Sequence, residues 1–514
     1  MAKKTVVAVG VIIALGAIWT GASWITGQQI EKHIGEATDS LNNVLKTNYP
    51  NSRLKVAYRD YQRGVFTSRL ALVVQTEGEP AADKEIVVNA EISHGPFPIR
   101  PFSLAPVMAS VHAELANTEA VKPLFEMTSN KPFISVDSRI SYNGDTHSTV
   151  MLLALDTQSP DTKLNFSGAS LQLNLSSDLR AAEISGTLGS LLMEKNRIDG
   201  VTEKLSLQDM ALSSNTHKGK FDIDLGDNTL TLKKLALDIQ EGDSVTINDL
   251  ALTSQVSEDT TNLAGKSALT LGSIMWRDQN LGSLMMNINF SGFDGKGTKQ
   301  FATEYHKTYR EMLRNIDDNT TADTYTQQLS SVVLHNLPLL LKGNPTISVA
   351  PLSWKNAKGE STFTFAIDMT DPLQKAAATS AAPAQSDEET LFRNSVKKVD
   401  AKLNVPLDMI TELMVQTAPK ATSDEQKKQT ETMARQQTQL MANIGQMSQV
   451  TVTQNNAITS SLQYADGFVT FNARKIPLAE FLAPFISVPT QEGTEEEGDD
   501  DTQTPAEPST PTAK

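Results

Sequence analysis

The sequence lacks cysteine altogether, since none of its 514 residues is a cysteine. This absence excludes thiol catalysis, disulfide bonds and zinc sites built from cysteine. Aromatic residues are also scarce, at 6% of the chain, so the core is expected to consist mainly of Leu and Ile. A chain of this length without disulfides has to be stabilised by such a core alone.

The familiar signatures of catalysis and cofactor binding are also missing. The chain contains no P-loop, no G-x-G-x-x-G and no G-x-S-x-G, and none of its seven histidines stands in H-E-x-x-H spacing. Asp222 and Asp224 resemble the start of a calcium loop, but the loop's final Glu is absent. The sequence therefore predicts no catalytic residue, no cofactor and no metal ligand.

Acidic residues outnumber basic ones, and the formal charge is -15. Nucleic acid is excluded as a partner, because phosphate binding requires clustered Lys and Arg. Eight of the acids lie after residue 489, in a stretch rich in Pro and Thr. Residues 490–514 are accordingly expected to form a disordered acidic tail.

One long uncharged segment stands near the start of the chain, from Thr5 to Thr26. Its 22 residues match the roughly 20 that a helix needs to cross a bilayer core. Trp19 and Trp24 lie in its last third, where indole rings are typical of the membrane interface. Residues 1–28 are therefore predicted to be a single-pass membrane anchor.

Lys3 and Lys4 precede this segment, and Lys near a span is retained in the cytoplasm. The N-terminus is thus expected inside and the body outside. A cleaved signal peptide is the alternative, but the apolar run is too long and no A-x-A site follows it. Small residues at four-residue spacing would allow two such helices to associate. They are Gly10 with Ala14 and Ala17 with Gly21.

The rest of the chain is predicted to be a β-rich α+β protein with a large antiparallel sheet. Residues 29–50 have the spacing of an amphipathic juxtamembrane helix, and residues 51–298 alternate apolar and polar side chains between short turns. Residues 299–375 are expected to hold an inserted helical hairpin followed by strands. Residues 376–489 should contain a helical tract and a closing β-hairpin.

Within that last region, a helical tract is predicted over residues 388–446. Its Gln-rich part, residues 423–439, is almost wholly polar, and such a helix is expected to project or fray. The dipeptide Asp466-Gly467 between alternating runs predicts a tight hairpin.

Three dense motifs are candidates for a structural or binding role. They are YQRGVFTS from Tyr61, HGPFP from His94, and LPLLLKG from Leu337 with VAPLSWK from Val349. The residues singled out in them are Tyr61, Gly64, Phe66, Ser68, His94, Gly95, Pro96, Phe97, Pro98, Pro351 and Trp354. His94 is either a catalytic or ligand-binding residue in an apolar mouth, or a structural turn residue beside Phe97. The second interpretation is favoured, because no partner group stands at a recognisable offset.

These motifs, together with VAVGVIIALGAIWTG, VKPLFEM, LPLLLKGNP and SLQYADG, resemble the enterobacterial YdgA/YihF family along nearly the whole chain. Members of that family share a domain of unknown function. The resemblance implies a protein anchored in the bacterial inner membrane with its body in the periplasm. It also implies homodimerisation, and it brings no catalytic residues with it.

The favoured hypothesis is a non-enzymatic envelope protein whose β-rich body binds lipid or another apolar ligand near the bilayer. It rests on the long alternating strands and on the anchor. The second hypothesis is a scaffold or assembly factor for envelope protein complexes, acting through the tract 388–446. The third is a hydrolase whose active site is assembled from distant strands.

Overall fold

The computed structural model describes residues 2–48, 53–76, 84–98, 105–196, 201–240, 243–314, 322–373, 387–465 and 467–486. The helices are α1 Ala2–Asn48, α2 Lys122–Met127, α3 Gly295–Arg314, α4 Ala322–Leu341, α6 Asp387–Ser395, α7 Leu407–Thr417, α8 Asp424–Met447 and α9 Leu478–Ile486. The strands are β1 Leu54–Arg63, β2 Thr67–Thr76, β3 Ile86–His94, β4 Ala109–Leu115, β5 Ile134–Ile140, β6 Thr146–Leu152, β7 Leu155–Gln158, β8 Thr162–Phe166, β9 Ala169–Leu175, β10 Ala181–Asn196, β11 Thr202–Lys218, β12 Asp224–Gln240, β13 Asp243–Glu258, β14 Asn262–Trp276, β15 Gln279–Asp294, β16 Thr346–Asn356, β17 Gly359–Met369, β18 Val396–Pro406, β19 Val452–Gln454, β20 Ala457–Ala465, β21 Phe468–Phe471 and β22 Arg474–Pro477.

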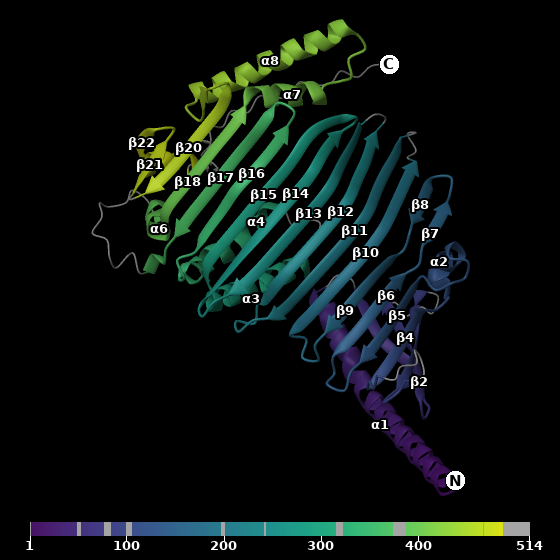
Figure 1. Cartoon of the computed structure of the whole chain (residues 1–514). Coiled ribbons are helices and arrows are strands. Elements are labelled where there is room, and N and C mark those ends of the chain that lie inside the picture. The colour runs from purple at the N-terminus through teal and green to yellow at the C-terminus, as the bar shows by residue number, and fades with distance from the viewer. Residues whose placement is uncertain are drawn as a thin grey trace, which may run out of the picture.

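All of these strands belong to one antiparallel sheet, as the alternating pattern predicts. Neighbours along the chain pair from β1 to β6, β6 then pairs with β9, and pairing continues in chain order from β9 to β18. The hairpin β7–β8 attaches to one end of β10, and β18 is followed by β20. Figure 1 shows the result as one long row of strands with α1 at its start and α7 and α8 across its far end.

Several helical predictions are confirmed. α3 and α4 form the inserted hairpin and pack against β15, and α9 follows β22, the strand after the predicted hairpin β20–β21. Pro338 lies inside α4, and the helix continues through it to Leu341. Leu340 and Leu341 are buried there, so packing of the last turn compensates for the missing backbone donor.

The helical tract predicted over residues 388–446 is wrong in two respects. β18 interrupts it, because Val399, Ala401 and Leu403 alternate as a strand and pair with β17 and β20. The Gln-rich part neither frays nor stands free. It forms α8, which Ser423 caps through Gln426 N and which packs on α7 through small buried side chains. The acidic tail 490–514 lies outside the described residues.

Buried apolar clusters occur at the two ends of the sheet. One gathers Leu70, Ala90, Ile92, Ala109 and Ala113 around β2 to β4, with Ile30 and Ile34 of α1 packed against it. Another surrounds Val399 and Tyr464 near β18 to β22. The strands between these ends, from β9 to β16, contribute no residue to the buried clusters found in the described part of the chain.

α1 is one continuous helix of 47 residues, so the predicted anchor and juxtamembrane helix are joined without a break. Within the described residues, we find no helix with the length and apolarity that crossing a bilayer requires. The side chains of Thr5 and Trp19 lie outside the described part, whereas those of Trp24 and Thr26 lie within it.

Candidate functional site

The second half of α1 is firmly attached to the start of the sheet. Ser23 Oγ donates to Gly95 O at 2.6 Å, and Arg63 pairs with Glu31 at 2.7 Å. Nearer the helix end, the side-chain amide of Asn42 makes two hydrogen bonds with the backbone of Val56, each 2.7 Å long. Residues 23–42 therefore lie along the sheet as a docked helix.

A buried polar network lies beneath this helix. His94 Nδ1 is 3.0 Å from Val65 O and His94 Nε2 is 2.8 Å from Ser68 Oγ. A carbonyl oxygen only accepts, so Nδ1 carries the proton and Nε2 accepts from the Ser68 hydroxyl. The Tyr61 hydroxyl lies 3.2 Å from Ser68 Oγ and donates to Gly27 O at 3.4 Å, which connects the network to α1.

Gly27 lies against the His94 ring, because a Cβ there would come within 2.6 Å of Cε1. Ser68 and His94 are 0% and 1% exposed, so α1 closes this Ser–His pair off from solvent. Burial lowers the pKa of His94, and the neighbouring charge of Arg63 acts in the same direction. The imidazole is thus neutral and serves as a hydrogen-bonding bridge between β1, β2 and β3.

The first two sequence motifs meet at this network. Gly64 N donates to Thr67 O in the β1–β2 turn, Phe66 O accepts from His94 N, and Pro96 O accepts from Val107 N. The Gly95–Pro96 bond is cis. Pro98 is fully buried, whereas Phe97 is 36% exposed.

The third motif lies elsewhere. Pro351 follows a cis peptide bond at an irregularity of β16, and Trp354 Nε1 donates to Leu281 O at 2.9 Å across β15. Leu337 and the residues after it end α4. The structure therefore does not bring Pro351 and Trp354 together with His94.

A second feature is an apolar face that runs across the middle of the sheet. Residues directly opposite each other in antiparallel strands point to the same side, as do residues two apart in one strand. One row across the sheet consists of Leu171, Gly186, Leu212, Leu230, Leu252, Leu269, Met286, Leu352 and Phe363. The adjacent row consists of Ala169, Leu188, Met210, Leu232, Leu250, Leu271, Leu284 and Trp354. We call these two rows the apolar face.

The opposite side of the same strands carries smaller and more polar side chains. There, Thr187, Ala211, Thr231, Ala251 and Thr270 form one row. Of the leucines of the apolar face only Leu232 is buried, and Leu252 is 39% exposed. The central strands thus present a broad apolar surface that the described chain covers only in part.

The apolar face is hollowed over β6, β9, β10 and β11. The hollow has a volume of about 230 Å³, and Val150, Leu171, Leu188 and Met210 contribute to its wall. Gly186 lies in its lining, where an added Cβ would crowd Leu171 and Leu212. The first row continues from Leu171 through Val150, Val136, Ala113 and Ala90 to Leu70, where Ile30 and Ile34 of α1 cover it.

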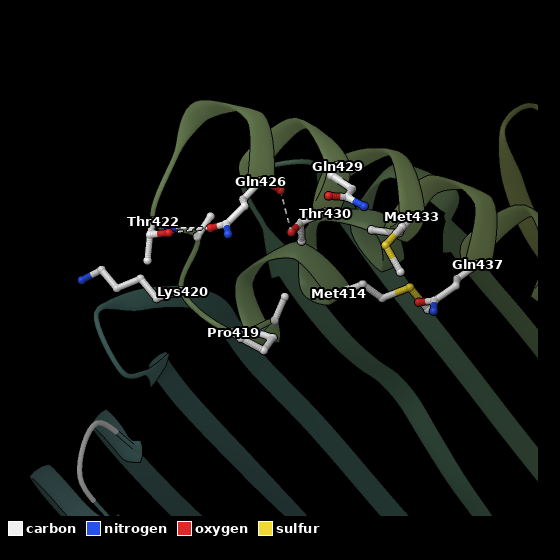
Figure 2. Close-up of a pocket in the computed structure, with 12 residues that line it drawn as sticks. Met414, Pro419, Lys420, Thr422, Gln426, Gln429, Thr430, Met433 and Gln437 are labelled. Atoms are coloured by element: carbon white, nitrogen blue, oxygen red, sulfur yellow. Dashed lines mark hydrogen bonds between the residues drawn. The ribbon is translucent and has the colours of Figure 1, made fainter.

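A cleft of about 600 Å³ lies between the end of α7, the loop after it and the first part of α8, at the far end of the sheet (Figure 2). Met414, Met433 and Gln437 lie on its walls, and Lys420 contributes its one charged side chain. No group of acidic or histidine side chains that could hold a metal ion occurs among the described residues. The lining of this cleft suits contact with an uncharged partner, and it contains no recognisable group of catalytic residues.

Several residues of the attachment site were missed by the sequence analysis, namely Ser23, Gly27, Asn42 and Arg63. Arg63 also stacks on Trp24, with its guanidinium carbon 4.3 Å from the ring centroid. Gly27 directly after the uncharged run was a usable signal. Asn42 offered none, because its partner lies in another element.

Comparison with known proteins shows to which family the chain belongs. The model of a family described as "Bacterial protein of unknown function (DUF945)" matches residues 1–479. The chain belongs to this family. The matched residues include α1 and all strands of the sheet, from β1 to β22.

Named relatives within this family come from Escherichia coli (strain K12). The chain is 34% identical to Protein YdgA over 94% of its own length and 97% of that protein. It is 24% identical to the uncharacterized protein YihF, over 93% of this chain and 98% of YihF. The YdgA/YihF resemblance seen in the motifs is confirmed. No solved structure matches the chain.

Proposed function

We propose that this chain is a membrane-anchored protein of the bacterial envelope that holds the acyl chains of a lipid on the apolar face. The observation that carries the proposal is the pair of apolar rows crossing the sheet without a buried cluster above them. Monomeric proteins rarely leave so large an apolar surface without a partner. No catalytic step is included in the proposal.

The geometry suits a long, flexible apolar ligand. Leu and Met predominate in the rows, and the wall of the hollow is largely apolar. Burying one methylene contributes about 0.8 kcal/mol, so an acyl chain gains affinity with each strand it crosses. A compact polar substrate would gain little on such a surface.

The uncharged run from Thr5 to Thr26 and the preceding Lys3 and Lys4 support the anchor and its orientation. In this arrangement the N-terminus is cytoplasmic and the body is periplasmic, at the inner membrane. The docked part of α1 then holds the beginning of the apolar face close to the outer leaflet.

A photocrosslinking experiment tests the proposal. The full chain is reconstituted with a phosphatidylethanolamine that carries a diazirine in its acyl chain, irradiated, and mapped by peptide mass spectrometry. We expect labelled peptides from β10 to β14 in addition to the anchor. Absence of body labelling, with the anchor labelled, would refute acyl-chain binding.

Matched variants sharpen this test. Leu230→Asp with Leu252→Asp places two carboxylates on the apolar face, and should reduce labelling of the body at least tenfold. Thr231→Asp with Thr253→Asp places the same charges on the polar side of the same strands, where both threonines are exposed. The body of this control variant should be photolabelled as strongly as the body of the natural chain. Equal labelling of both variants would contradict a specific role of the apolar face.

A scaffold function is the second candidate, and α8 favours it. Met433, Leu440, Met441, Ile444 and Met447 are at least half exposed, and their spacing puts them along one side of the helix. An Ile444→Glu variant should then lose an envelope protein partner in crosslinking while its lipid labelling stays unchanged. Unchanged crosslinking would count against this function.

A further inference from the structure

The place where α1 leaves the body carries exposed apolar side chains of its own. Trp24 and Ile25 of α1 are 41% and 58% exposed, although their neighbours Ser23 and Thr26 are buried. Val65 in the β1–β2 turn is 39% exposed, and Phe97 after β3 is 36% exposed. We call these four residues the collar.

Contacts within the body bring the collar together. Ser23 binds Gly95 O, and Gly95 stands two residues before Phe97. Arg63, which stands two residues before Val65, stacks on Trp24. His94 connects the two loops, because it binds Val65 O and lies against Gly27. The four exposed side chains therefore lie at one level of α1, two on the helix itself and two on the loops packed against it.

That level is the N-terminal end of the docked helix. From residue 42 of α1 toward the N-terminus, Asn42 binds the backbone of Val56, Glu31 pairs with Arg63, and Ser23 binds Gly95 O. β1 therefore runs alongside α1, and the β1–β2 turn lies at the end of the docked helix that is nearer the N-terminus of the chain. β3 ends at this same edge of the sheet, because Ser93 pairs with Thr67 at the start of β2. In Figure 1 this edge lies where α1 emerges from the sheet.

We propose that the collar inserts into the outer interface of the bilayer around the anchor helix, so that lipid headgroups and upper acyl chains are its partner. This inference rests on the proposed membrane anchor. The uncharged run ends at Thr26, within the collar, which fixes the collar at the depth of the interface. Trp and Arg are side chains suited to that depth, since each combines an apolar body with a polar end.

Insertion has a structural consequence. Because α1 is docked along 23–42, the collar and the anchor hold the sheet at a fixed angle to the membrane. Ile30 and Ile34 cover the start of the apolar row four and eight residues beyond Thr26, about 6 and 12 Å along the helix. A lipid leaving the outer leaflet would meet the apolar face there.

The absence of cysteine makes a clean spin-labelling test possible. Val65→Cys and Phe97→Cys are labelled in the full chain, reconstituted in vesicles of phosphatidylethanolamine and phosphatidylglycerol. Leu440→Cys and Met447→Cys are matched controls, since these apolar residues are 58% and 83% exposed at the far end of the sheet. Val11→Cys, inside the uncharged run, reports on the anchor itself.

Collisions with oxygen and with a water-soluble nickel chelate are then compared. We expect the labels at Val65 and Phe97 to show an oxygen-to-nickel collision ratio at least fivefold above the controls. If the nickel chelate reaches the labels at both Val65 and Phe97 freely while the label at Val11 is protected, the collar does not insert into the bilayer, and the proposed anchor is unaffected. Exposure of Val11 would overturn both. Protection of the collar from oxygen and nickel alike would indicate a protein partner and also overturn the proposal.

Discussion

At the scale of single residues, Gly27 and His94 decide how the helix meets the sheet. The ring of His94 is fixed by Ser68 and Val65, so it cannot move aside for a side chain at position 27. Close packing of this kind makes even one methyl group costly. The packing of α1 against His94 therefore requires a residue without a Cβ at position 27.

We predict that Gly27→Ala weakens docking of α1 by about 1–3 kcal/mol, the usual cost of overpacking. Hydrogen exchange of the backbone amides of residues 28–42 measures the effect. Gly35→Ala is the control, because a Cβ at Gly35 meets nothing within 4 Å. That variant should slow exchange slightly, since Ala favours helix over Gly by about 1 kcal/mol. Equal effects of the two substitutions would show that His94 does not restrict the site.

The pH dependence of docking follows from His94. Burial lowers its pKa in the folded protein, so the unfolded chain binds the proton more tightly. This contribution to stability is complete above the ordinary imidazole pKa of about 6.5 and is lost as the pH falls from there toward the lower folded-state value. Amide exchange in residues 28–42, corrected for intrinsic rates, should accelerate between pH 7 and pH 5.

His112 is an internal comparison with the opposite sign. Its hydrogen bond with Asp137 raises its pKa, so its stabilisation is present at low pH and is lost as the pH rises through that value. A His94→Gln variant should lose the acceleration on acidification, whereas His112→Gln should retain it. If both variants behaved alike, His94 would not be the responsible group.

At the scale of elements, α1 also protects the edge of the sheet. β1 pairs only with β2 among the described strands, so its other side takes no part in the sheet ladder. Asn42 satisfies both groups of Val56 with one side-chain amide. Open edges invite pairing with other chains, and covering them with a helix is a known remedy.

We predict that Asn42→Leu destabilises docking by about 1–3 kcal/mol, because two backbone groups lose their partner. It should also promote self-association through β1, measurable by analytical ultracentrifugation in detergent. Asn43→Leu is the control, since Asn43 is exposed on the same helix. A monodisperse Asn42→Leu sample with unchanged exchange would argue against an edge-protecting role.

At the scale of the whole molecule, the sheet has packed ends and an open middle. Buried clusters near β2–β4 and β18–β22 hold the ends. The middle relies on long backbone ladders, such as β11 with β12, and on whatever covers the apolar face. Stability of the middle is therefore expected to depend on a bound ligand.

Removal of lipid should lower the thermal stability of the middle strands. A ligand at one hundred times its dissociation constant stabilises by about 2.7 kcal/mol, which delipidation would remove. Hydrogen exchange of β11 to β14 before and after delipidation, with β2 to β4 as internal reference, checks this. Uniform changes in both regions would contradict ligand binding on the apolar face.

The sequence by itself determined the element types, because periodicity is local. Strict alternation predicted the antiparallel strands, the helical hairpin expected after residue 298 corresponds to α3 and α4, and Asp466-Gly467 predicted the hairpin β20–β21. The same reasoning failed over 388–446, where β18 is fixed by pairing with β17 and β20. Membership of the family was readable from motifs alone.

Only the tertiary structure decided which residues meet. Tyr61, Ser68 and His94 stood out in the sequence, but the contact of this network with Gly27 depends on α1 lying alongside β1. The apolar rows likewise depend on register, because a shift of one residue would send each Leu to the other side. Alternation is a property of one strand, whereas a continuous apolar face arises only when many strands align.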